Sequence, residues 1–286
     1  MIEEPRFSKP MSFFWLMRLN RTIMVALIAG ASAFAAGAGT ATSLWMTLAG
    51  WCLAVGGFSL DFYADRDLDM KGPRSEVRHN PLSDGSLTPL TGLSFSLTFL
   101  IISFGITLIV SPWSLLPWAI TLAVIIGLAR HLFEGPITRA LTLGLLQALY
   151  VFIGAIAGSI SPGLCLIAGF FFFAMFGGRG MIDIRDFPQD EATRVQTLPR
   201  RYGIKRTARF TAICLVISYL LSLSAYFTGD FNDIYLYLVI AFVAIGLVCA
   251  WLFATRPSPR LAYILTIVFM MVMGTIICLA MILGSI

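Results

Sequence analysis

The amino-acid sequence predicts an all-α membrane protein, a bundle of nine transmembrane helices with a cytoplasmic N-terminus and a C-terminus outside. Of the 286 residues, 58% are hydrophobic and only 12% are charged, whereas ordinary soluble domains carry about 25% charged residues. Apolar stretches recur at the length of about 20 residues that crosses a bilayer. This composition excludes soluble enzymes, disulfide scaffolds, disordered proteins and nucleic-acid binders, and we expect membrane lipid and no nucleic acid as a partner.

Nine apolar stretches separate at charged and Pro/Gly-rich breaks. In chain order they are 16–36, 42–63, 91–110, 113–133, 138–158, 163–183, 207–228, 233–254 and 261–284. Little chain is left for a soluble domain, so residues 1–286 are expected to form a single domain. Two long connections, at about 64–90 and 184–206, are expected to cap it on the cytoplasmic side.

The basic residues predict the orientation of the bundle. All 20 Lys and Arg residues lie before or at the start of the first stretch, or in and around connections on that same side. The opposite connections, such as 36–42 and 159–163, contain none. Because basic residues are retained on the cytoplasmic side, the sequence predicts an integral protein of the plasma membrane whose long connections face the cytoplasm.

The first long connection opens with the acidic run DFYADRDLD. If the second span continues as a helix, each fourth residue lies only about 40° further round the axis. Asp61, Asp65 and Asp69 would then share one face, which we call the first aspartate ladder, while Asp67 points elsewhere.

The second long connection opens with DIRDFPQDE. Asp186 and Asp190 repeat the four-residue spacing, with Asp183 one turn earlier; these three form the second aspartate ladder. If both ladders bind one cluster of ions, facing carboxylates should approach within roughly 10 Å, and the second and sixth spans should lie close together.

The ladders predict a site for a hard cation. Like charges four residues apart destabilise a helix, and carboxylates at membrane depth are costly without partners. Oxygen ligands without His or Cys favour Mg²⁺ over Ca²⁺, and Mg²⁺ in proteins often completes its coordination with substrate phosphates. The alternative is that both runs are solvated helix ends. We favour a Mg²⁺–diphosphate site, with a substrate that has an anionic head and a hydrocarbon tail, such as an isoprenyl diphosphate.

The two ladders resemble the paired motifs of the UbiA-type intramembrane prenyltransferases. The first motif of that family reads N-x-x-x-D-x-x-x-D, with Asp61 here in place of Asn, and the second reads D-x-x-x-D. Residues 15–22, WLMRLNRT, are similar to its first-helix sequence, and 177–186, GGRGMIDIRD, to archaeal ether-lipid members. The resemblance implies Mg²⁺-dependent transfer of a prenyl chain from a diphosphate to a lipophilic acceptor: an aromatic compound, a quinone precursor or a glycerol-lipid hydroxyl.

The resemblance also implies roles for individual residues. Asp65, Asp69, Asp186 and Asp190 are the expected catalytic residues, and all six ladder carboxylates are candidate metal ligands. The candidate diphosphate-binding cations are Arg18, Lys71, Arg74, Arg78, Arg130 and Arg194. Asn20 and Asn80 are expected in the substrate pocket; Asn80 stands where the family commonly has Arg, so the phosphate contact would pass to the neighbouring cations.

Two other functions remain open on the sequence alone. A UbiA-type terpene cyclase would use the same site without an acceptor, and a cation transporter would use the acids as an ion path. Transport favours acids near the bilayer midplane, whereas these lie at the cytoplasmic ends of spans. His131 is expected to be an ordinary polar loop or interfacial side chain, and Asp230 and Asp233 to solvate an outer loop.

Overall fold

The computed structural model describes residues 8–70, 80–133, 135–193, 195–268, 272 and 274–286. These residues form α-helices joined by short connections, with one 3₁₀ turn, η1 (Pro112–Ser114). The helices are α1 (Lys9–Met17), α2 (Leu19–Ala35), α3 (Thr40–Asp69), α4 (Pro89–Val110), α5 (Leu115–Ala129), α6 (Pro136–Ala155), α7 (Pro162–Arg185), α8 (Phe187–Thr193), α9 (Leu198–Tyr202), α10 (Ile204–Tyr226), α11 (Asp233–Thr255), α12 (Pro259–Ile267) and α13 (Gly274–Gly284).

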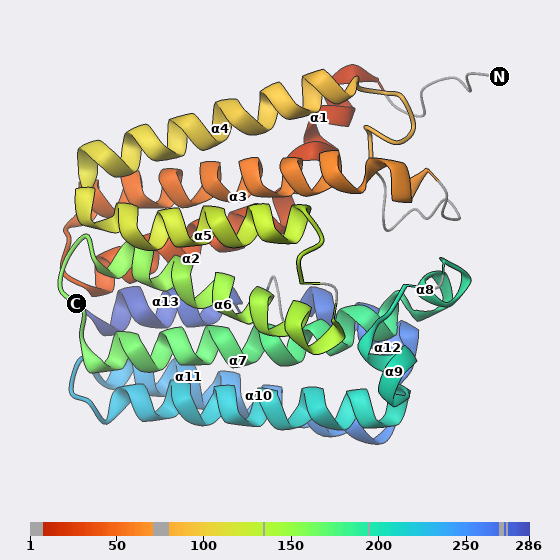
Figure 1. The fold of residues 1–286 in the computed structure, drawn as a ribbon. Helices are drawn as coiled ribbons and strands as arrows, with labels where there is room; N and C mark the ends of the chain where they lie inside the picture. The colour runs from red at the N-terminus through yellow and green to blue at the C-terminus, as the bar shows by residue number, and fades with distance from the viewer. Residues whose placement is uncertain (1–7, 71–79, 134, 194, 269–271, 273) are drawn as a thin grey trace.

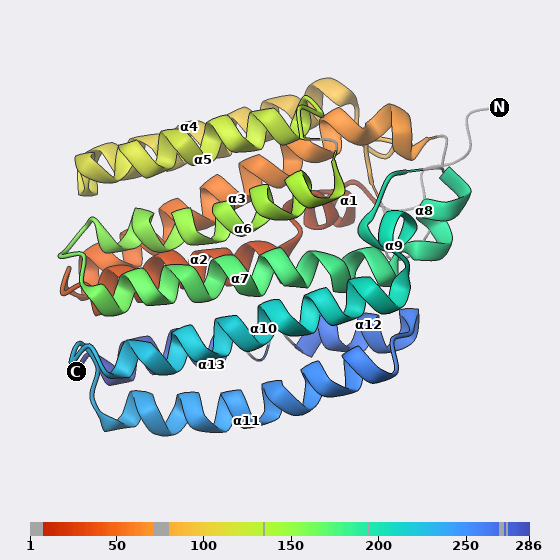
Figure 2. The ribbon, with the colours of Figure 1, turned by 60° about the horizontal axis from the view of Figure 1, so that its bottom comes forward.

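The long helices run side by side along one axis (Figures 1 and 2). Helix α1 and the end of α13 lie at opposite ends of this bundle (Figure 1). The short helices α8 and α9 lie at the same end as α1 and α12. We call this the polar end, because both aspartate ladders lie there.

Seven of the described helices are long and apolar enough to cross a membrane. The pair α1 and α2, bent by 43°, raises this number to eight if it is taken as one broken span. The stretch 261–284, predicted as one span, contains two shorter helices, α12 and α13. The all-helical membrane fold is therefore confirmed, and the number of nine spans stays a prediction.

Hydroxyl and proline residues set where several helices begin. Thr88, Ser161 and Ser258 each accept a hydrogen bond from a backbone N–H three residues later, and each is followed by proline. A side-chain cap satisfies an N–H that the helix leaves unpaired, and proline at the first helical position lacks an N–H that would go unused. The sequence pattern thus fixes the starts of α4, α7 and α12.

Asp230 also holds the start of α7. One of its carboxylate oxygens, Oδ2, accepts hydrogen bonds from the backbone N–H of Gly163 at 2.6 Å and from Thr228 Oγ1 at 2.7 Å. Asp233 accepts one from the Tyr226 hydroxyl at 2.7 Å. Asp230 therefore does more than solvate the loop, because it ties the loop to the start of α7, while Asp233 is exposed at the start of α11.

Small residues allow the helices at the centre of the bundle to approach closely. A Cβ added to Gly154 on α6 would clash with the backbone carbonyl of Ala29 on α2, and one added to Gly177 on α7 would lie 2.5 Å from the Cβ of Cys214 on α10. Close backbone approach at small residues is a common way for membrane helices to pack. Through these contacts α2, α6, α7 and α10 surround the cavity described below.

Candidate functional site

A cavity of about 640 Å³ opens at the polar end of the bundle and brings the two aspartate ladders together. Asp61, Asp65 and Asp69 line it from one side, because α3 stays helical as far as Asp69. Asp186 and Asp190 line it from the other side. Residues more than a hundred positions apart in the sequence thus share one chamber, as the spacing of the motifs predicted.

The second ladder is not one continuous helix. Helix α7 ends at Arg185, Asp186 is its C-cap, and α8 begins at Phe187. Pro188 explains the break, since it has no N–H to continue the hydrogen bonds of α7, whereas in the first turn of α8 that N–H is not needed. The break turns α8 away from the axis of α7, and Asp190, which is buried, still lines the cavity.

Five arginines among the described residues line the same cavity: Arg18, Arg21, Arg139, Arg179 and Arg185. Arg185 forms a two-pronged ion pair with its neighbour Asp186, with both N···O distances at 2.7 Å. The guanidinium of Arg21, which is half-buried, interacts electrostatically with Asp61 and Asp186, and also with Arg18 and Arg185. One arginine thus interacts with a carboxylate of each ladder.

Two residues at the edge of the site have left-handed backbones, Arg18 with φ 46° and His131 with φ 54°. The Arg18 guanidinium lies over the ring of Phe62 on α3, 3.9 Å from its centroid. His131 Nε2 lies 3.6 Å from Asp65 Oδ1. Such a conformation is uncommon for residues other than glycine, and strained backbones cluster at functional sites. His131 is thus an exposed residue of a turn, as expected, that does not line the cavity but contacts one carboxylate of the first ladder.

Asp183 does not line the cavity. Its Oδ1 lies 2.7 Å from Arg179 Nε, and its Oδ2 accepts a hydrogen bond from the backbone N–H of Leu198 at 3.1 Å. The residue is only 2% exposed. Its assignment as a metal ligand is therefore not supported by the geometry; it fixes the start of α9 against α7 instead.

Asn80 is also turned away from the cavity, contrary to its expected place in the substrate pocket. Its side-chain amide donates to the carbonyl of Phe62 and to Asp69 Oδ2, both at 2.9 Å, and its Oδ1 accepts from the N–H of Leu82 at 3.0 Å. It is 2% exposed. Asn80 thus holds the carboxylate of Asp69 from behind.

The other predicted residues separate into three groups. Asn20 and Arg18 line the cavity. Arg130 is exposed at the end of α5 and does not line it, and Asp67 is exposed and paired with Arg66 at 3.2 Å. The remaining four predicted cations lie outside the described residues: Lys71, Arg74, Arg78 and Arg194.

Sequence reasoning assigned no role to Arg139, Arg179 and Arg185, which line the cavity. The sequence could have indicated that two of them lie beside ladder carboxylates, since Arg179 precedes Asp183 by one helical turn and Arg185 is adjacent to Asp186. Arg139 offered none, because it lies near the start of α6, far in sequence from either ladder.

The carboxylates fit Mg²⁺ together with a phosphate group rather than a ready-made protein cage. Across the described part of the chain, no three His, Cys, Asp or Glu side chains lie close enough together to form a metal site by themselves. Mg²⁺ is usually bound by one or two carboxylates, with waters and substrate phosphates completing its octahedron. The all-oxygen donors, with arginines around them, match that pattern.

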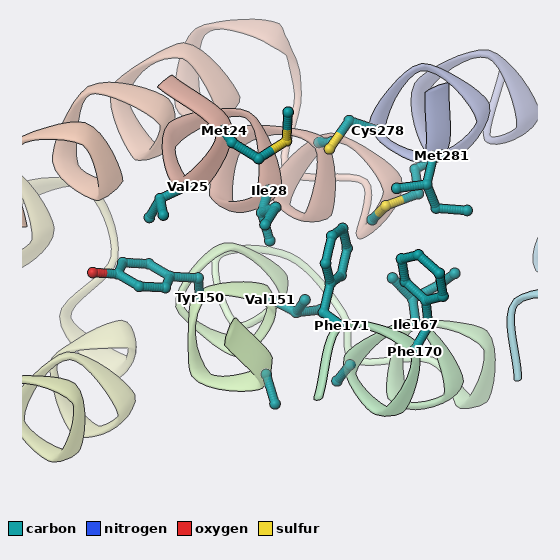
Figure 3. Packing of buried hydrophobic residues seen from close by; sticks show 14 of the residues in the cluster. Met24, Val25, Ile28, Tyr150, Val151, Ile167, Phe170, Phe171, Cys278 and Met281 are labelled. Carbon is teal, nitrogen blue, oxygen red and sulfur yellow. The ribbon is translucent and has the colours of Figure 1, made fainter. Parts of the chain in front are cut away.

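Beyond the charged groups the cavity becomes apolar. Val25 and Ile28 on α2 are directed toward Tyr150 on α6 and Phe171 on α7, and all four line the cavity (Figure 3). The chamber therefore offers charge at one end and hydrocarbon and aromatic surface at the other.

This fold and this cavity define a polytopic membrane protein with a chamber that is charged at one end and apolar at the other. Comparison with known proteins gives the family: the model of the UbiA prenyltransferase family matches residues 22–273. The chain belongs to the UbiA prenyltransferase family. It is thus an integral membrane protein and an enzyme of the prenyltransferase class.

Relatives and solved structures agree with this placement. A digeranylgeranylglyceryl phosphate synthase from Methanospirillum hungatei is 27% identical over 212 residues, covering 71% of this chain and 73% of its own. One from Natronomonas pharaonis is 24% identical over 229 residues, covering 79% and 81%. The structure of a UbiA homologue from Archaeoglobus fulgidus bound to GPP and Mg²⁺ has a TM-score of 0.70 at 14% identity, covering 93% of this chain and 99% of its own.

Proposed function

We propose that this protein transfers a prenyl chain from an isoprenyl diphosphate to a lipophilic acceptor and releases diphosphate. The observation that supports this most strongly is the cavity in which five of the six ladder aspartates and five arginines meet next to an apolar chamber. The ladders and arginines would bind the diphosphate with Mg²⁺, and the apolar chamber would bind the prenyl chain. The GPP and Mg²⁺ bound by the Archaeoglobus homologue are consistent with this division.

The carboxylates that would hold Mg²⁺ are those that line the cavity: Asp61, Asp65, Asp69, Asp186 and Asp190. Bound Mg²⁺ would neutralise charge on the departing diphosphate. Arg21 and Arg185 would add hydrogen bonds to the phosphate oxygens, because guanidinium groups match phosphate in a two-pronged geometry. For Arg185 this contact requires the guanidinium to leave Asp186, which frees both oxygens of that carboxylate.

Aromatic rings and water exclusion would serve the other half of the reaction. As the allylic carbon–oxygen bond breaks, positive charge develops on the prenyl carbon, and aromatic faces such as those of Phe58 and Tyr150 favour it. Both residues line the cavity. The connections at about 64–90 and 184–206 would cap the chamber and keep out water that competes with the acceptor.

Among the possible acceptors we favour a glycerol-phosphate lipid hydroxyl over an aromatic compound or a quinone precursor. The two relatives named above are digeranylgeranylglyceryl phosphate synthases. Arg139 on α6 also lines the cavity, and a guanidinium is a common partner of phosphate groups.

The topology belongs to the same proposal. We infer nine spans in a single domain covering residues 1–286, an N-terminus and active site on the cytoplasmic face of the plasma membrane, and a C-terminus outside. The distribution of basic residues supports this orientation, as do α1 and the end of α13 at opposite ends of the bundle (Figure 1).

The test is incubation of the purified protein with labelled geranylgeranyl diphosphate and Mg²⁺, with and without a membrane lipid extract. A labelled lipid that forms only with the extract supports transfer. A free hydrocarbon or alcohol without the extract indicates a cyclase instead. Absence of diphosphate release under either condition would contradict the proposal and favour ion transport.

A further inference from the structure

The apolar chamber follows one face of α7 from the polar end toward the middle of the bundle. The cavity-lining residues of this helix recur every three or four positions, as one helical face requires; they are Phe170, Phe171, Ala174, Met175, Gly178, Arg179, Met181, Ile182 and Arg185. Helix α7 therefore gives the depth of the chamber. From Phe171 to Asp186 the rise of about 1.5 Å per residue amounts to about 22 Å.

This depth corresponds to a definite length of prenyl chain. With carbon–carbon bonds of about 1.5 Å, an extended isoprene unit spans about 5 Å, so about four units fit between the diphosphate site and the deep end. Any residue that closes the deep end would then limit the length of the chain.

Aromatic rings from three helices close the deep end. The ring of Phe170 on α7 packs edge-on against Phe242 on α11, with centroids 5.6 Å apart, and Phe242 packs in the same way against Tyr219 on α10 at 5.4 Å. All three line the cavity. Beyond them lies packed core, including the fully buried Tyr235 and Val239.

Tyr219 is held in place by a glycine. A Cβ added to Gly246 on α11 would lie 2.5 Å from Tyr219 Cζ and 2.7 Å from its hydroxyl oxygen. The ring thus rests directly on the backbone of α11 and occupies space that any larger residue at position 246 would take. Because Tyr219 is fully buried, its ring has little room to move except toward the cavity.

We propose that Tyr219, supported by Gly246, sets the upper limit on the length of the prenyl chain at about four isoprene units. This inference rests on the proposed function. It gives opposite expectations for the two positions: removing the ring deepens the chamber, whereas a side chain at position 246 pushes the ring inward and makes the chamber shallower.

The experiment measures binding and turnover separately, with farnesyl, geranylgeranyl and geranylfarnesyl diphosphate and Mg²⁺. Binding is the rise in the thermal midpoint of the detergent-solubilised protein, and turnover is diphosphate release. Tyr219→Ala removes more atoms than one isoprene unit adds. It should therefore raise the preference for the C25 over the C20 donor by at least tenfold, because a single methylene can change specificity about tenfold or more. Tyr219→Leu keeps an apolar side chain and should shift the preference in the same direction if the Ala variant does not fold.

Gly246→Ala should shift the preference from the C20 toward the C15 donor. Its matched control is Gly105→Ala on α4, where an added Cβ meets no atom within 4 Å and the preference should not change. Tyr219→Phe keeps the ring and should keep the C20 limit, which separates ring size from the hydroxyl.

Either of two results would overturn the inference. The wild-type protein would bind the C20 and C25 donors equally, or the variants at position 219 would keep the wild-type preference for donor length. In both cases the proposed function still holds, since the donors bind and react. If no diphosphate raises the thermal midpoint of the wild-type protein, the proposed function fails, and the inference fails with it.

Discussion

Asn80→Ala tests how the first aspartate ladder is held. The substitution removes one charge-assisted hydrogen bond, to Asp69, and two neutral ones, to Phe62 and from Leu82. At about 1 kcal/mol for each neutral bond and about 2 kcal/mol for the charged one, the loss is about 4 kcal/mol. Half of that loss falls on Asp69, whose carboxylate loses its hydrogen bond from Asn80.

The assay combines thermal unfolding in detergent with diphosphate release across a Mg²⁺ titration. Loss of a residue that orients a metal ligand typically weakens metal binding by about 10–100-fold. We therefore expect Asn80→Ala to lower the thermal midpoint and to raise the Mg²⁺ concentration for half-maximal activity by at least about tenfold.

The control is Ser83→Ala, in the same turn. The Ser83 hydroxyl donates to the Asn80 backbone carbonyl at 2.9 Å, and no hydrogen bond joins it to Asp69 in the described structure. Its loss should cost about 1 kcal/mol of stability and leave the Mg²⁺ dependence unchanged. If Asn80→Ala lowers stability but keeps the wild-type Mg²⁺ dependence, Asn80 does not position Asp69 for metal binding.

Three further predictions concern the site, the packing and the response to pH. Alanine substitution at each of four ladder positions should nearly abolish diphosphate release while the protein stays folded; the four are Asp65, Asp69, Asp186 and Asp190. Substitution of the exposed Asp67 by alanine should lower diphosphate release only mildly. Near wild-type turnover in two of the four variants would refute the shared site. Gly154→Ala should lower the thermal midpoint strongly, because its Cβ would clash with the α2 backbone, while Gly105→Ala should leave it unchanged or raise it slightly; equal midpoints for the two would contradict the packing. Partial burial opposes ionisation of Asp230, but its hydrogen bonds outweigh this and hold its pKa below the usual value. The stabilisation by ionised Asp230 is therefore present above the unfolded-state pKa and is lost as pH falls through the lower folded-state pKa. Below pH of about 4 the thermal midpoint of the wild-type protein should fall more steeply than that of Asp230→Asn. Parallel curves of midpoint against pH would show that the hydrogen bonds of Asp230 contribute no stability.

Local sequence patterns were sufficient for the helical class and for the faces of individual helices. Hydropathy predicts spans because each one must satisfy its own backbone hydrogen bonds within the bilayer. The four-residue spacing placed Asp61, Asp65 and Asp69 on one face, because that face depends only on the helical repeat. Both properties arise from residues close together along the chain.

The tertiary structure decided which polar side chains face the cavity. Asp183 and Asp186 lie one turn apart, yet Asp183 bonds to the start of α9 while Asp186 lines the cavity. Asn80 likewise has its position set by its hydrogen bond to Phe62 on α3, and Arg139 lines the cavity from α6, far in sequence from either ladder. Sequence spacing determines direction about a single helix axis, whereas the helix or loop that a side chain meets depends on how all the helices pack together.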